Sequence, residues 1–263
     1  MILIAGDSWA AGEFKPEYWD LPLSQMISHG GLSEWLGQAG HQVLNISAPG
    51  GGNWDSVLKI SSFFMTNPGC NVDKIFIFQT DWVRDVYHHS TLGSKDRLIG
   101  NMFLQPMVHD FLDPTHANEY RDVVLSKFYS KLSTISQTYN VDVYLIGGLS
   151  DLLCTSIFEK EYPGLTPICQ SLVSLALNNN SVIVDEGNIT TGFIHGNSSK
   201  LVDFIKRKLS SAEQLHKLMH QVDLGLTRYN TLKNHTDLFP DGRHPGRSVH
   251  QALYNLILSK DIL

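Results

Sequence analysis

The chain begins with Met1-Ile2-Leu3-Ile4-Ala5, an apolar run that leads directly into Gly6-Asp7-Ser8. A short run of apolar residues only is typical of a strand buried on both faces of a parallel sheet. Because ligands of open α/β sheets bind beyond the carboxyl ends of the strands, Ser8 is expected where a substrate could reach it. The first N–H groups of a following helical turn would point at the same place. This stretch therefore predicts the start of an α/β sheet and a candidate nucleophile; a turn that only caps a helix is the alternative.

Strand-like and helix-like segments alternate along the rest of the chain. After the first strand, further strands are expected at 43–46, 74–78, 141–146 and 181–184. Helices are expected at 32–39, at 54–65, through 124–135 to about 139, at 201–222, and from about Pro245 onward. This order predicts a parallel sheet of about five strands with helices on both faces. The stretches around 84–118 and 186–240 are longer than ordinary connections, so we expect insertions there within a single domain spanning 1–263.

The composition indicates a globular protein and argues against several classes of partner. Of the 263 residues, 42% are hydrophobic and 17% charged, which suffices for a normal core. A net charge of −6 gives no reason to expect binding to nucleic acid or to an anionic membrane. No apolar stretch reaches the roughly 18 residues of a membrane span, and no signal peptide is evident, so a cytoplasmic location is expected. The cysteines, Cys70, Cys154 and Cys169, are too few and scattered for a disulfide framework, although one disulfide stays open.

A second polar motif, Asp241-Gly242-Arg243-His244-Pro245, precedes the last expected helix. A serine hydroxyl is a weak nucleophile and needs a base, a role that imidazole fills near neutral pH. A carboxylate then orients the imidazole and stabilises its protonated form. By itself the motif fits a helix cap beside a surface histidine. Together with Ser8, it indicates a catalytic triad of Ser8, His244 and Asp241.

These two motifs resemble the first and last sequence blocks of the SGNH/GDSL hydrolases, and they lie at the two ends of the chain. The resemblance implies a flavodoxin-like, three-layer α/β/α fold. It also implies an esterase, lipase, carbohydrate-deacetylase or acyltransferase activity, with Ser8, His244 and Asp241 as catalytic residues.

The middle blocks of that family are less regular here. The segment 45–53 resembles the second block, whose glycine N–H contributes to the oxyanion hole; Gly51 is the first choice, with Gly50 and Gly52 as alternatives. The third block normally reads Gly-x-Asn-Asp, but this chain has Gln79 at the glycine position and Asp81 at the asparagine position. An ionised Asp81 cannot donate to an oxyanion. Either Gln79 or Asn53 would then donate instead, or Asp81 would pair with Arg84 and serve another role.

Other motifs carry no comparable signal. His216 and His220 are spaced to share a helix face, but no third ligand accompanies them, so we expect neither a metal nor another cofactor. No GxGxxG, Walker, HExxH or GxSxG pattern is present in the sequence.

The sequence therefore predicts a serine esterase that cleaves an O-acyl ester, such as an O-acetyl group on a carbohydrate. Its expected partner is a small-molecule or carbohydrate ester, with no nucleic acid and no membrane. Two alternatives stay open: an O-acyltransferase that uses the same triad, and a catalytically silent carbohydrate-binding protein. The acyl group, the alcohol and the oligomeric state do not follow from the sequence.

Overall fold

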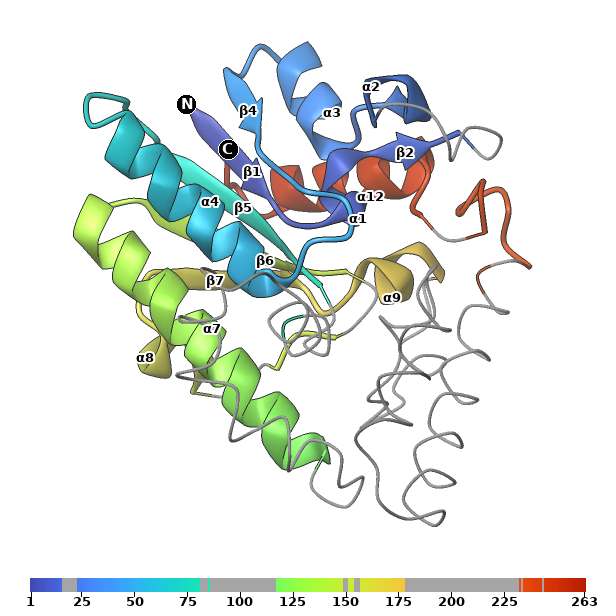
Figure 1. Cartoon of the computed structure of the whole chain (residues 1–263). Helices are drawn as coiled ribbons and strands as arrows, with labels where there is room; N and C mark the ends of the chain where they lie inside the picture. The colour runs from blue at the N-terminus through green and yellow to red at the C-terminus, as the bar shows by residue number, and fades with distance from the viewer. Residues whose placement is uncertain are drawn as a thin grey trace, which may run out of the picture.

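A five-stranded parallel sheet forms the centre of the molecule, in the order β4-β1-β5-β6-β7 (Figure 1). The computed structural model describes residues 1–15, 23–80, 85, 117–148, 151–153, 157–177, 232, 234–242 and 244–263. The strands of the sheet are β1 (Ile2–Ala5), β4 (Val43–Asn45), β5 (Lys74–Gln79), β6 (Asp142–Gly147) and β7 (Leu165–Cys169). Counted along the chain, this order is 2-1-3-4-5, the order of flavodoxin-like sheets. The expected parallel sheet of five strands is confirmed.

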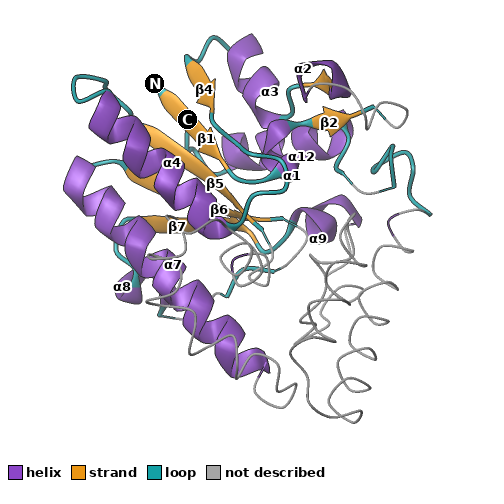
Figure 2. Ribbon diagram, in the orientation of Figure 1, coloured by secondary structure: helices purple, strands orange, loops and turns teal. Residues whose placement is uncertain are grey.

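Helices cover both faces of this sheet, as the ribbon in Figure 2 shows. One face carries α4 (Asn53–Thr66) and α7 (Ala117–Tyr139). The other face carries α3 (Leu32–Gln38), α9 (Leu172–Leu177) and α12 (Arg247–Ser259). The three-layer α/β/α arrangement is therefore present.

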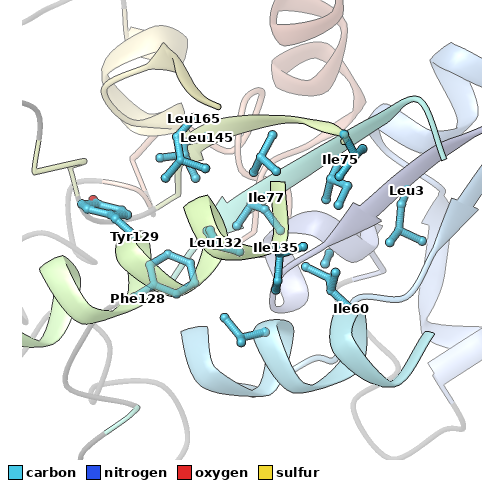
Figure 3. Packing of buried hydrophobic residues seen from close by; sticks show 14 of the residues in the cluster. Leu3, Ile60, Ile75, Ile77, Phe128, Tyr129, Leu132, Ile135, Leu145 and Leu165 are labelled. Carbon is cyan, nitrogen blue, oxygen red and sulfur yellow. The ribbon is translucent and has the colours of Figure 1, made fainter. Parts of the chain in front are cut away.

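Alternation along the strands divides the core between the two faces. Leu3 of β1 joins the buried cluster under α4 and α7, whereas its neighbour Ile4 joins the cluster under α3 and α12. Figure 3 shows the first cluster, in which Leu132 of α7 lies over the sheet near Ile77 of β5. Burying an aliphatic side chain of this size stabilises the fold by about 1.5–3 kcal/mol. The strands are almost uniformly apolar because both of their faces are covered.

Several shorter elements join the strands and helices described above. A helical turn, α1 (Ser8–Ala11), follows β1. Next come α2 (Leu23–Met26) and a small antiparallel ribbon of β2 (Glu13–Phe14) and β3 (Ile27–His29). A further short helix, α8 (Phe158–Glu161), precedes β7. The sequence does not predict the ribbon, α2, α8 or α9, because elements this short carry little periodicity.

The fifth strand of the sheet and the start of the last helix differ from what the sequence predicts. The fifth strand is β7, which contains Pro167. Proline lacks a backbone donor and is tolerated there because β7 is the edge strand, but its presence hid the strand in the sequence. Helix α12 begins at Arg247 with Gly246 as its N-cap, two residues later than expected from Pro245. The strand expected at 181–184, the helix expected at 201–222 and most of both expected insertions lie outside the described residues.

Among the helices that the structure describes, none is long and apolar enough to cross a membrane. Cys70 and Cys169 carry free thiols, and Cys154 lies outside the described residues. Burial raises the pKa of the Cys169 thiol to about 12, so this sulfur stays protonated at neutral pH.

One histidine in the core is a candidate pH sensor of stability. His250 lies on the inner face of α12 with 0% of its surface exposed, and neither ring nitrogen has a hydrogen-bond partner among the described residues. Burial lowers its pKa to about 3, and the nearby His29 acts in the same direction against a smaller opposing effect of Glu13. The folded state therefore holds His250 neutral at pH values where the unfolded chain protonates it.

We expect His250→Leu to reduce the loss of stability in acid. Because the unfolded state binds a proton below its ordinary pKa of 6.5 and the folded state does not, wild-type stability falls as the pH falls toward 3. Relative to the variant, the wild-type free energy of unfolding should fall by about 1.4 kcal/mol per pH unit in this window. Urea unfolding of both proteins between pH 7 and pH 4 measures the difference. Parallel stability curves would show that His250 protonates equally in both states.

Candidate active site

Ser8 lies just after a sharp turn at the carboxyl end of strand β1. Gly6 has a φ of +151°, and a Cβ at this position would lie 2.8 Å from the Cβ atoms of Ala10 and Phe78. A side chain would therefore be both strained and too crowded here. Asp7 caps the following turn by accepting a hydrogen bond from the Trp9 N–H at 2.9 Å. Ser8 consequently starts α1 at the carboxyl end of β1, as expected.

A tight turn before α12 places Asp241 and His244 together. Gly242 adopts a left-handed conformation with a φ of +69°, and its N–H donates to the Phe239 carbonyl at 2.7 Å. The N–H of His244 then donates to Oδ1 of Asp241 at 2.7 Å. The other carboxylate oxygen, Oδ2, lies 2.6 Å from Nδ1 of the same histidine. Spacing of three residues thus lets one carboxylate hold both the backbone and the ring of His244.

The imidazole of His244 also contacts Ser8, beyond the carboxyl end of β1. His244 Nε2 lies 2.9 Å from Ser8 Oγ, although the two residues are 236 positions apart. An ionised Asp241 only accepts hydrogen bonds, so Nδ1 carries a hydrogen and Nε2 is left to accept the serine hydroxyl. Ser8 and His244 are both buried, and the Asp241 side chain is 1% exposed. The structure therefore brings together the three residues that the sequence predicts as a triad, in hydrogen-bonding order.

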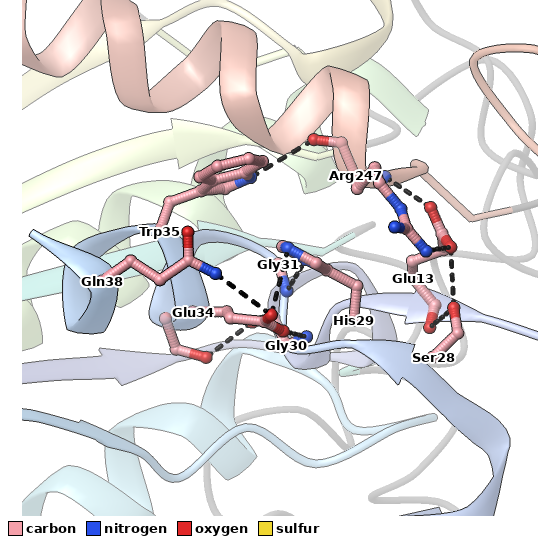
Figure 4. Close-up of polar contacts among 10 residues, drawn as sticks. Glu13, Ser28, His29, Gly30, Gly31, Glu34, Trp35, Gln38 and Arg247 are labelled. Carbon is pink, nitrogen blue, oxygen red and sulfur yellow. Dashed lines mark hydrogen bonds and ion pairs between the residues drawn. The ribbon is translucent and has the colours of Figure 1, made fainter.

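The β2–β3 ribbon supports His244 with two residues that sequence analysis missed. The Phe14 ring packs on the imidazole with 4.4 Å between centroids. Glu13 accepts from the Arg247 N–H at 2.6 Å and from its guanidinium at 3.2 Å, and the Ser28 hydroxyl donates to the same carboxylate at 2.7 Å (Figure 4). Partial burial opposes ionisation of Glu13, but these hydrogen bonds outweigh it and lower its pKa. No motif marks either residue, because their role depends on contacts with residues more than 200 positions away.

The segment 48–52 before α4 forms a turn in which the Gly51 N–H already has a hydrogen-bond acceptor. Its N–H donates to the Ala48 carbonyl at 2.8 Å. The N–H of Gly52 donates to Oδ2 of Asp55 at 2.7 Å, which places it at the start of α4. In this conformation, the preferred oxyanion donor of the sequence analysis therefore closes a turn. Its role in oxyanion binding stays a prediction.

The two amide side chains considered as oxyanion donors are engaged in the scaffold. Asn53 donates from Nδ2 to the Thr80 carbonyl at 3.1 Å and to Asp85 at 3.0 Å. Gln79 donates to the Asp151 carbonyl at 3.0 Å and accepts from the Tyr129 hydroxyl. Both hydrogens of the Asn53 amide are thus committed, and Gln79 ties β5 to the segment after β6.

The backbone of Ser8 supplies another donor at the site. Its N–H is at the first position of α1, where helical N–H groups have no partner within the helix. No described residue accepts a hydrogen bond from it. This group suits an oxyanion that forms on a carbon bonded to Ser8 Oγ.

Asp81, Arg84, His216 and His220 all lie outside the described residues. Within the described part of the chain, no group of three histidine, cysteine or acidic side chains is arranged to hold a metal ion.

No protein-family model matches the chain, and no curated protein matches its sequence.

The contacts of Glu13 predict an asymmetric pair of mutations. Glu13→Ala removes the acceptor of the first N–H of α12 and should lower the free energy of unfolding by about 1–2 kcal/mol. Arg247→Ala keeps that N–H and removes only a guanidinium whose side chain is 59% exposed, so its effect should be smaller. Urea unfolding of the two variants measures the order. An equal or larger loss for Arg247→Ala would mean that the ion pair, not the helix cap, matters.

Proposed function

We propose that this chain is a serine hydrolase of the SGNH/GDSL type, which cleaves an O-acyl ester with Ser8 as its nucleophile. The observation that carries this proposal is the unbroken hydrogen-bonded order from Ser8 through His244 to Asp241. The flavodoxin-like strand order is compatible with it, because the three residues lie beyond the carboxyl end of β1, where such sheets bind ligands.

In the proposed reaction, His244 Nε2 takes the proton of the Ser8 hydroxyl while Oγ attacks the ester carbonyl. Asp241 holds the imidazole and stabilises its charge, and the Ser8 N–H donates to the oxyanion. The intermediate collapses as His244 returns its proton to the leaving alcohol, which gives an acyl-Ser8 ester. Water then attacks this ester, again with His244 as base, and releases the carboxylic acid and the free hydroxyl.

We propose a small O-acyl ester, such as an O-acetyl group on a carbohydrate, as the substrate class. In the alternative, an O-acyltransferase, the acyl group of acyl-Ser8 is transferred to a sugar hydroxyl instead of to water. Analysis of the products with and without an added sugar acceptor distinguishes the two activities. The free thiols of Cys70 and Cys169 are compatible with the reducing cytoplasm, and that location stays a prediction.

A fluorophosphonate probe tests the nucleophile directly. Wild type should be labelled at one site, which peptide mass spectrometry should assign to Ser8, and Ser8→Ala should lose the label. His244→Ala should slow labelling by about 10²–10⁴-fold because the base is removed. Asp241→Asn should slow it by about 10³–10⁴-fold because the imidazole is no longer held in the reactive tautomer.

Hydrolysis of p-nitrophenyl acetate provides the parallel activity measurement, with circular dichroism as the control for folding. Equal labelling of wild type and Ser8→Ala would falsify the nucleophile assignment. A folded wild type with neither labelling nor turnover would favour the silent binding protein.

A further inference from the structure

A chain of buried hydrogen bonds runs behind Ser8, from a carboxylate outside the triad to the turn that carries the nucleophile. Its members are Asp85, Asn53, Thr80 and Asp7, each at most 4% exposed. They come from four places in the sequence: the segment after β5, the start of α4, the end of β5 and the end of β1. The proposed reaction uses none of their side chains directly.

The side-chain amide of Asn53 pairs with both backbone groups of Thr80, as the backbone of a neighbouring strand would. Its Oδ1 accepts from the Thr80 N–H at 2.9 Å, and its Nδ2 donates to the Thr80 carbonyl at 3.1 Å. Thr80 directly follows β5, where these two backbone groups lie beyond the end of the strand. The Asn53 amide therefore fixes the backbone conformation at the carboxyl end of the strand beside β1.

Thr80 also contacts Asp7, the residue that caps the helical turn α1 and directly precedes Ser8. The Thr80 hydroxyl donates to Oδ2 of Asp7 at 2.8 Å. The other oxygen of Asp7 accepts from the Trp9 N–H and thereby caps α1. Because Ser8 lies between Asp7 and Trp9 in the sequence, the direction of its hydroxyl depends on the position of Asp7.

Asp85 stabilises the same orientation of Asn53 from the other side of the amide. Its Oδ2 accepts from the Asn53 amide at 3.0 Å, and its Oδ1 accepts from the Trp54 N–H at 2.9 Å. The fit is close, since a Cβ added to Gly52 would lie 2.4 Å from Asp85 Oδ1. With Asp85 as acceptor, the amide nitrogen of Asn53 faces Asp85, and its oxygen is directed at the Thr80 N–H.

We propose that Asp85 is a positioning residue for Ser8, which acts through Asn53, Thr80 and Asp7 and must be ionised for the nucleophile to be aligned. This inference rests on the proposed function, because it requires Ser8 to react. It assigns a role to the region where the chain departs from the family's usual third block.

The ionisation of Asp85 falls within an accessible pH range. Burial raises its pKa to about 7; the N–H donors of Trp54 and Asn53 oppose this shift, and the charge of Asp55 adds to it. Among the described residues, the acidic group that acts on it is Asp55 of α4, and Asp7 is connected to it through Thr80 and Asn53. No described lysine or arginine forms an ion pair with it. A protonated oxygen would present a hydrogen to a neighbouring N–H donor in place of a lone pair. Full activity therefore requires an ionised Asp85 in addition to the neutral imidazole that accepts the Ser8 proton.

The test is the acid limb of the pH profile. We expect log(kcat/KM) for p-nitrophenyl acetate, and the logarithm of the second-order rate constant of fluorophosphonate labelling, to rise with a limiting slope of about 2 in wild type. Asp85→Asn should lower both rate constants by about 10- to 100-fold near neutral pH, because a small misplacement of the nucleophile is costly. Its limiting slope should fall to about 1.

Asp55→Asn is the matched control, since Asp55 also accepts a backbone N–H at the start of α4 but makes no hydrogen bond to Asn53 or Thr80. It should keep the slope of about 2 and stay within about twofold of the wild-type rate. Thr80→Val interrupts the chain between Asn53 and Asp7 and should slow labelling as Asp85→Asn does, whereas Thr80→Ser should restore it. This pair carries the test if Asp85→Asn does not fold.

The outcomes separate the two proposals. If wild type is labelled at Ser8, but folded Asp85→Asn keeps the wild-type rate or a slope of 2, the positioning role is wrong and the hydrolase remains. If Thr80→Val and Thr80→Ser both match wild type, the role is also wrong. If wild type is not labelled at all, the hydrolase itself fails.

Discussion

Packing of α12 on the sheet is the constraint on which the candidate site depends. Val249, Leu253 and Ile257 of this helix are almost fully buried in the cluster that contains Ile4 of β1 and Phe78 of β5. A close-packed interface of this kind leaves a helix little freedom to slide or rotate. The turn just before α12 is thereby held at the end of β1, and a base from one end of the chain meets a hydroxyl from the other.

Polar and aromatic contacts further restrain the position of α12 and of His244. Glu13 anchors the first N–H of α12, and the Phe14 ring lies against the imidazole, so one short ribbon restrains both the helix and His244. On the other side of the sheet edge, Asn53 and Gln79 satisfy backbone groups beyond the strand ends. Buried carbonyl and N–H groups must find partners, and side-chain amides are well suited because each both donates and accepts. Residues that look like oxyanion donors in the sequence therefore serve the scaffold in this conformation.

Two buried ionisable groups outside the triad, Asp85 and His250, differ in how well the fold can accommodate their charged forms. Asp85 accepts hydrogen bonds from Asn53 and Trp54, whereas His250 has no partner among the described residues. Burial favours the neutral form of both, so the pKa of the acid rises and that of the histidine falls. The hydrogen bonds to Asp85 make its ionised form accessible near neutral pH, while His250 stays neutral. A change of pH therefore acts on the two groups differently: Asp85 changes its charge near neutral pH within the folded protein, whereas His250 affects the stability of the fold in acid.

Local sequence determined the parts of this protein that repeat or follow a pattern. The apolar strands β1, β5 and β6, the helices α4, α7 and α12, and the two motifs around Ser8 and His244 all follow from the sequence, because each depends on neighbours within a few residues. The edge strand with Pro167, the support from Glu13 and Phe14, and the hydrogen bonds of Asn53 do not. Only the tertiary structure decided these, since each joins segments far apart in the chain. Such contacts leave no periodic or local signal, and they form only when the sheet and its covering helices bring the segments together.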